Sequence, residues 1–208
     1  MEALSDVPPT EQPDPHRYRT LAPEPPEGPL ELATLLPGQG EIELEIGFGH
    51  GLFLYERAVA RPDARLLGLE IKRKWAYLVA ERCARRGLRN VTVWAGDARG
   101  VLPRIPDAAI TRLFMSFPDP WWKKRHHKRS LVGAALLDEI ARILRPGGEF
   151  FLQTDVEDRA SSHLEALAGD TRFSAGYLDA NPFQARSNRE ARAAEDGLPV
   201  YRTLARRL

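Results

Sequence analysis

The sequence of 208 residues is 43% hydrophobic and 28% charged, which is typical of one soluble globular domain with at most a short appendage. It contains no run near the roughly 20 apolar residues of a membrane span and no apolar segment typical of a signal peptide, and its single cysteine, Cys83, excludes an internal disulfide and a cysteine-based metal cluster. The formal net charge of +1 is uneven, because residues 1–40 carry seven acidic and two basic side chains (−5), which leaves +6 for the remainder.

The first 40 residues differ in composition from the rest. Nine of the 17 prolines lie within residues 1–37, with few large apolar side chains. Such a segment buries little apolar surface, so we expect residues 1–40 to form a disordered or loosely packed tail. The domain proper is expected to span residues 41–208.

From residue 41 onward, strand and helix patterns alternate. Strands are predicted at residues 41–46, 66–69, 91–94, 110–117 and 150–152, and helices at 52–59, 75–83 and 131–144. Two closing strands are predicted at 173–178 and 200–204, with a polar loop over 180–199 between them. This alternation predicts an α/β domain built around a mostly parallel sheet, in which ligands bind at the carboxyl ends of the strands.

A glycine loop follows the first predicted strand, with glycines at positions 47, 49 and 51. Leu52 stands where the dinucleotide-binding fingerprint needs a further glycine, and the Gly-Lys-Ser/Thr of phosphate-binding loops is absent. Glu45 would place a negative charge beside a pyrophosphate. The loop therefore favours a cationic ligand over a dinucleotide, which disfavours a dehydrogenase.

Acidic residues also end the next two strands. Glu70 stands where an acid accepts from ribose hydroxyls, and Asp97 can accept from an adenine amine. A nucleoside that carries a positive charge and no phosphates is S-adenosylmethionine. The structural alternatives are that Glu45 pairs with Arg65, that Glu70 pairs with Lys72 and that Asp97 caps a helix.

The fourth predicted strand leads into the most distinctive stretch, FPDPWWKKRHHKR at residues 117–129. Two prolines stiffen the loop around Asp119, and the cations after it suit a polyphosphate. The alternative is a surface loop before a solvated basic helix. Trp121 can either stack on a base or pack in the core. The histidines lack the spacing of a metal site, so no metal is expected.

With these motifs the chain resembles the bacterial tRNA (guanine-N7-)-methyltransferases, a branch of the class I S-adenosylmethionine-dependent methyltransferases. The resemblance covers about residues 41–208 and rests on EIGFGHG at 45–51, GLE at 68–70, GDA at 96–98, FPDPW at 117–121 with its basic residues, QTD at 153–155, and Ser187 with Glu190. It implies a Rossmann-like fold with a seven-stranded sheet and helices on both faces. It also implies methyl transfer to N7 of guanine 46 in the tRNA variable loop. The single cysteine fits a protein of the reducing cytoplasm.

The resemblance further implies a role for each matching residue. Asp119 would be catalytic and would also contact the cofactor. The other expected cofactor contacts are Glu45, Gly47, Gly49, Gly51, Glu70 and Asp97. The expected guanosine contacts are Lys123, Asp155, Ser187, Asn188, Arg189 and Glu190. The expected RNA contacts are Arg125, His126, His127, Lys128, Arg129 and Ser130. Serine replaces the family's usual threonine at position 187 and keeps the hydroxyl.

The chemistry of guanine N7 is consistent with this set of residues. N7 carries an in-plane lone pair and no proton, so its methylation needs alignment and electrostatics, and it needs no general base. One rival is a methyltransferase acting on an amine, and another is an RNA-binding protein that keeps the fold without the reaction. We expect tRNA as the partner, no membrane association, and a monomer, with a homodimer as the alternative.

Overall fold

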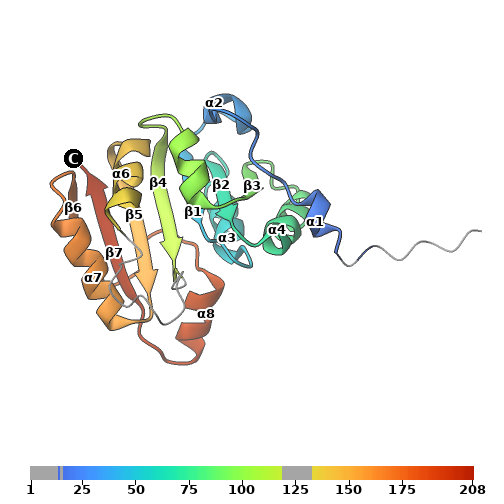
Figure 1. The fold of residues 1–208 in the computed structure, drawn as a ribbon. Coiled ribbons are helices and arrows are strands. Elements are labelled where there is room, and N and C mark those ends of the chain that lie inside the picture. The colour runs from blue at the N-terminus through green and yellow to red at the C-terminus, as the bar shows by residue number, and fades with distance from the viewer. Residues whose placement is uncertain (1–13, 15, 119–132) are drawn as a thin grey trace, which may run out of the picture.

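The computed structural model describes residues 14, 16–118 and 133–208 and shows a seven-stranded sheet with helices on both faces (Figure 1). The strands are β1 (Ile42–Ile46), β2 (Arg65–Glu70), β3 (Val91–Ala95), β4 (Ile110–Ser116), β5 (Leu144–Thr154), β6 (Phe173–Leu178) and β7 (Tyr201–Arg207). Their order in the sheet is β3-β2-β1-β4-β5-β7-β6, and β7 runs antiparallel to both of its neighbours. The predicted fold class is confirmed.

The helices form two layers. Apolar side chains of α3 (Leu52–Ala60) and α4 (Arg73–Arg85) pack on one face of the sheet. Those of α5 (Ala98–Val101), the 3₁₀ turn η1 (Leu102–Arg104), α6 (Ala134–Ile143) and α7 (Glu157–Ala168) pack on the other. Three further helices are α1 (Tyr18–Leu21), α2 (Leu32–Leu35) and α8 (Asn188–Glu195).

Successive side chains of the central strands point to opposite faces of the sheet and pack against the two helix layers in turn. Leu113 and Met115 of β4 join the cluster under α6, whereas Phe114 between them stacks against Phe53 of α3, with ring centroids 4.7 Å apart. This is the two-residue period expected for a strand that is buried on both faces. Cys83 is buried, as expected for a small core residue.

The prediction of a loosely packed tail over residues 1–40 is wrong for its second half. Leu30, Leu32 and Leu36 are at most 2% exposed and belong to the same core cluster as Ile42. Each buried leucine contributes roughly 1.5–3 kcal/mol relative to exposure, which is sufficient to fix this proline-rich segment on the domain. Residues 1–13 and 15 lie outside the described residues.

Two other predicted boundaries are also wrong. The segment 180–199 is not a continuous polar loop, because it contains α8, whose N-cap Ser187 accepts a hydrogen bond from the Glu190 amide. The helix predicted over 131–144 ends at Ile143, since Leu144 already pairs with Ile110 at the start of β5. The pairing then shifts to Arg112 opposite Glu149, so residues 145–148 bulge out between the two pairs.

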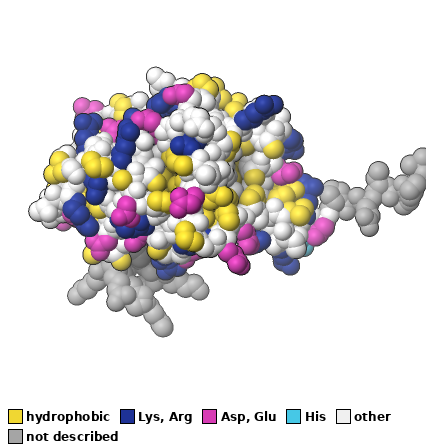
Figure 2. All heavy atoms as spheres, turned by 90° about the horizontal axis from the view of Figure 1, so that it is seen from above, with side chains coloured by type: hydrophobic (Ala, Val, Ile, Leu, Met, Phe, Trp, Pro, Cys, Tyr) yellow, Lys and Arg dark blue, Asp and Glu magenta, His cyan; other side chains and the backbone are white. Residues whose placement is uncertain are grey.

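The carboxyl ends of β4 and β5 point away from α2 (Figure 1). Figure 2 looks from the α2 side and shows Lys and Arg mingled with Asp and Glu. Oppositely charged side chains on this side form ion pairs, for example Arg145 with Glu41 (2.6 Å) and Arg206 with Glu149 (3.0 Å). Of the described site residues, five lie at or just after the carboxyl ends of the strands: Glu45, Gly47, Glu70, Asp97 and Asp155.

Candidate functional site

The glycine loop lies between β1 and α3 and is held against β2. Gly47, Gly49 and Gly51 all have positive φ angles, of 75°, 53° and 76°, which glycine adopts most readily. The Gly47 amide donates to the Leu69 carbonyl (2.8 Å), and the Gly49 amide donates to Oε2 of Glu70 (2.9 Å). The loop is therefore fixed against the carboxyl end of the neighbouring strand.

Gly51 also allows a close approach of two helices. A Cβ atom added at Gly51, which begins α3, would lie 2.7 Å from Cγ1 of Val79 in α4. That distance is shorter than any ordinary van der Waals contact, so no larger residue fits without movement. The last glycine of the loop thus has a packing role in addition to its φ angle.

Glu45 is the penultimate residue of β1, next to this loop, and forms no ion pair with a cation among the described residues. Its side chain is 2% exposed, and Oε2 has no hydrogen-bond partner among the described residues. Burial, with the nearby Glu70 carboxylate as a second cause, raises the pKa of Glu45 to about 8. The alternative pairing with Arg65 is not formed, because that guanidinium donates to the Gly40 and Ala33 carbonyls. Glu45 is therefore suited to receive a cationic group from a ligand.

Glu70 ends β2 and is 6% exposed. Besides the Gly49 amide, its carboxylate accepts from the Lys72 amide at 2.9 Å through Oε1. The alternative raised by the sequence is an ion pair between Glu70 and the Lys72 side chain, but the hydrogen bond that forms is to the Lys72 backbone amide. The two amides fix the carboxylate at the edge of the sheet between the glycine loop and the start of α4.

Asp97 follows β3 and is the N-cap of α5, which agrees with the predicted alternative that Asp97 caps a helix. Oδ1 accepts from the Arg99 amide (3.0 Å), and the hydrogen bonds from the Arg99 guanidinium hold the pKa of Asp97 below its usual value. Its side chain is 32% exposed. The cap fixes the carboxylate and leaves part of it accessible at the same edge of the sheet as Glu45 and Glu70.

The predicted guanosine contacts within the described residues, Asp155 and residues 187–190, come together at the first turn of α8. Oδ1 of Asn188 accepts from the Leu52 amide (3.3 Å), directly after the glycine loop, and Arg189 forms an ion pair with Asp155 after β5 (2.5 Å). Residues 136 and 34 positions apart in the chain are thereby brought together. The fold thus places this turn beside the predicted cofactor loop.

Glu190 lies inside this turn and is 4% exposed. Its carboxylate accepts from Gln153 (3.1 Å), Asn181 (3.1 Å) and Arg202 (2.9 Å). These three partners were not predicted as site residues. The polar Gln153 within the apolar run of β5 is the sequence signal that could have predicted them, because a buried amide needs hydrogen-bond partners.

The FPDPW stretch begins at the end of β4. Phe117 has a φ angle of +48°, unusual for a non-glycine residue and costly before a proline, and its amide donates to the Gln153 carbonyl (2.7 Å). Backbone strain of this kind concentrates at functional sites. The predicted residues Asp119, Lys123, Arg125, His126, His127, Lys128, Arg129 and Ser130 lie outside the described residues.

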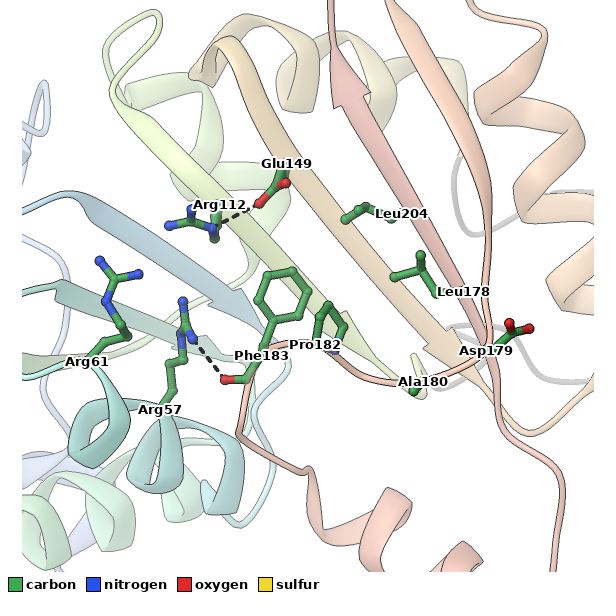
Figure 3. Close-up of a pocket in the computed structure, with 10 residues that line it drawn as sticks. All are labelled: Arg57, Arg61, Arg112, Glu149, Leu178, Asp179, Ala180, Pro182, Phe183 and Leu204. Carbon is green, nitrogen blue, oxygen red and sulfur yellow. Dashed lines mark hydrogen bonds and ion pairs between the residues drawn. The ribbon is translucent and has the colours of Figure 1, made fainter.

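A cavity of about 510 Å³ lies elsewhere, beside the start of β4 and β5 (Figure 3). Its arginines and Glu149 are already paired, for example Arg112 with Glu149 (3.0 Å) and Arg57 with Glu43 (2.7 Å), and Phe183 lies at its side. It contains none of the predicted site residues, so we do not assign it to the site.

The described part of the chain shows neither a cluster of metal-binding side chains nor a membrane-spanning helix. No group of three or more His, Cys, Asp or Glu side chains is placed there to hold a metal ion. In the same residues, no helix has both the length and the apolar character needed to cross a membrane.

The chain is similar to known methyltransferases. A family model described as "Putative methyltransferase" matches residues 39–203. The tRNA (guanine-N(7)-)-methyltransferase of Nitrosococcus oceani is 38% identical over 84% of this chain and 75% of its own length, and that of Caulobacter sp. is 40% identical over 71% and 66%. A SAM dependent methyltransferase from Aquifex aeolicus shares the fold, with a TM-score of 0.57 and 15% identity over 85% of this chain and 87% of its own.

Proposed function

The chain belongs to the tRNA (guanine-N(7)-)-methyltransferase family, and from this premise we propose that it transfers a methyl group from S-adenosylmethionine to N7 of guanine 46 in the variable loop of tRNA. The observation that carries the proposal is Glu45, which is buried beside the glycine loop and whose Oε2 has no hydrogen-bond partner among the described residues. A buried carboxylate without a cation is costly, and a cationic ligand would compensate it.

The residues at the ends of β1, β2 and β3 fit this cofactor. In the proposal, Glu45 faces its positive charge, Glu70 accepts from the ribose hydroxyls and Asp97 accepts from the adenine amine. When bound, S-adenosylmethionine supplies a methyl group on a sulfonium, ready for displacement. The glycine loop adds no phosphate-binding lysine, which fits a ligand without phosphates.

The chain's own work is alignment and charge stabilisation. Because N7 has no proton, no residue needs to act as a general base. We assign Asp119 to orient the guanine and to favour the cationic product base, and Lys123 to donate to the guanine oxygen. The strained Phe117 fixes where that loop leaves β4.

The first turn of α8 is the proposed guanosine-binding element. Ser187, Asn188 and Arg189 line it, and Asp155 faces it through the ion pair with Arg189. Glu190 acts in this proposal by holding the turn in place, since its carboxylate already accepts from three side chains. The segment Arg125–Ser130 would meet the RNA phosphates, so binding should weaken steeply as salt rises.

The test is methyl transfer from labelled S-adenosylmethionine to an unmodified tRNA transcript, with the modified guanine mapped by cleavage at N7-methylated sites. Label at one variable-loop guanine is expected. Asp119→Ala should abolish it, whereas Asp63→Ala, an exposed carboxylate paired with Arg61, serves as the matched control. Label on an exocyclic amine would support the amine methyltransferase instead. RNA binding without label would support the binding protein.

A further inference from the structure

Residues 22–26, which we call the N-terminal strap, lie along the free edge of the sheet. The Pro23 carbonyl accepts from the Ala95 amide (2.6 Å) at the carboxyl end of β3, the outermost strand. Ala22 is 5% exposed and packs in the cluster with Val93. The strap precedes the region that the family model matches, which begins at residue 39.

The strap contacts both loops that carry the nucleoside-binding carboxylates of the proposed site. Glu24 forms an ion pair with Arg73, which begins α4 three residues after Glu70. Cγ and Cδ of Pro25 lie 3.9 Å from the position that a Cβ of Gly96 would occupy, immediately before Asp97. One short segment therefore contacts the start of α4, three residues after Glu70, and the end of β3, two residues before Asp97.

Contacts on either side of the strap hold it in place. Upstream, the Arg17 guanidinium lies 5.1 Å from the centre of the Tyr77 ring and 3.8 Å from Glu81. Downstream, Nε of Arg104 donates to the Gly28 carbonyl (2.8 Å), and Leu30 enters the core. Prolines at 23, 25 and 26 restrict the backbone between these anchors.

We propose that the N-terminal strap is the outer wall of the cofactor site, in which Glu24 and Pro25 position the loops of Glu70 and Asp97 around the nucleoside of S-adenosylmethionine. This inference rests on the proposed function. Glu24 and Pro25 are positioning residues, because they act through Arg73 and Gly96. The Glu24–Arg73 pair is 56% and 38% exposed, so it adds little to overall stability and its main effect is local.

The test compares full-length wild type with the double variant Glu24→Ala/Pro25→Ala. S-adenosylhomocysteine binding is measured by calorimetry, and 5′-methylthioadenosine, which lacks the amino-acid portion, is the second probe. Both dissociation constants should rise by a similar factor, about fivefold to tenfold for a coupling of this kind, because the strap acts at the nucleoside end. The KM for S-adenosylmethionine should rise, while the KM for tRNA and kcat at saturation stay unchanged.

Two further variants separate positioning from general stabilisation. Arg17→Ala removes the contacts upstream of the strap, to Tyr77 and Glu81 of α4, without changing the residues that contact Arg73 and Gly96, and should leave both dissociation constants unchanged. The charge reversal Glu24→Arg should weaken binding, and Glu24→Arg with Arg73→Glu should restore it, because the ion pair forms again with the charges exchanged.

The outcomes distinguish the strap from the proposed function. If wild type binds S-adenosylhomocysteine and the double variant binds it equally well, or if the charge exchange restores nothing, the strap proposal is overturned and the proposed function stands. If wild type binds neither probe, the proposed function is overturned and the strap proposal with it.

Discussion

Glu43 and Glu45 lie two residues apart on the same face of β1, both at most 2% exposed, yet their surroundings are opposite. Glu43 accepts two hydrogen bonds of 2.7 Å from the Arg57 guanidinium. Glu45 has an oxygen without a partner among the described residues and faces Glu70. One carboxylate is balanced by a cation within the fold, and we propose that a bound ligand balances the other.

The first prediction follows from the pKa of Glu45, raised by burial from 4.5 to about 8. The folded state then holds a proton that the unfolded chain has lost between those two values. The free energy of unfolding should therefore fall as pH rises through this window, by at most about 1.4 kcal/mol per unit. Urea titrations from pH 5 to 9 should show this fall in wild type and a flatter profile in Glu45→Gln. Parallel profiles would contradict it.

The second prediction concerns binding at the same residue. The cationic amino group of S-adenosylhomocysteine should favour the ionised form of Glu45, so binding at pH 7 should release close to one proton and strengthen as pH rises toward 8. Calorimetry in two buffers of different ionisation enthalpy measures the released proton directly. Proton release that persists in Glu45→Gln would assign the effect to another group.

The third prediction is that Gly51→Ala destabilises the protein by two separable effects. The positive φ angle costs roughly 1–2 kcal/mol for a residue with a Cβ, and overlap with Val79 adds about 1–3 kcal/mol. Gly147→Ala is the matched control, because its φ is +74° and no atom lies within 4 Å of the added Cβ. Gly51→Ala/Val79→Ala should recover part of the loss in thermal midpoint. If Gly51→Ala and Gly147→Ala cost the same, the overlap is unimportant.

The fourth prediction tests the buried ion pair of β1 and α3. Arg57→Met should cost about 3 kcal/mol in urea unfolding, because it strands the Glu43 carboxylate in the core. This is the low end of the usual range, since Arg112 stays 3.1 Å from Glu43. Glu43→Gln/Arg57→Met should cost less than Arg57→Met alone. A larger cost for the double variant would mean that the arginine acts through packing on Phe183 instead.

The strands were predictable because apolar runs ended at turn or acidic residues. The run at 173–178, for example, coincides with β6, whereas β7 continues to Arg207, three residues beyond its predicted end, because it pairs with β5 and β6 on both sides. Helix α7 was not predicted, since Leu164 and Leu167 are its only large aliphatic residues. Helix α8 was missed because an Ala- and Arg-rich segment lacks an apolar stripe, although Ser187 and Glu190 have the spacing of a capping box.

The acidic residues of the site were predictable as strand ends, but their partners were not. Nothing local in the sequence shows that Glu45 lacks a cation or that Glu24 reaches Arg73, 49 positions away. These relationships depend on which strands become neighbours and on how the N-terminal segment crosses the edge of the sheet. For the same reason, the sequence does not predict that Gln153, Asn181 and Arg202 surround the Glu190 carboxylate.

The last prediction concerns Gln153, which connects the two substrate-binding elements of the proposed site. Its side chain is 0% exposed, and Nε2 donates to Ser116 Oγ (3.0 Å) at the end of β4 and to Glu190 Oε2 (3.1 Å) in α8. Gln153→Leu keeps the approximate size of the side chain and removes both hydrogen bonds. The first turn of α8 then loses one of the three side chains that bind the Glu190 carboxylate. We expect kcat/KM for tRNA to fall about tenfold, the equivalent of one buried hydrogen bond to a charged group, with S-adenosylhomocysteine binding unchanged.

Ser116→Ala is the control, because it spares the bond to Glu190 and should have the smaller effect. Equal losses in the two variants would mean that Gln153 acts through its bond to Ser116 of β4. An unchanged kcat/KM in Gln153→Leu would show that Asn181 and Arg202 are sufficient to hold Glu190.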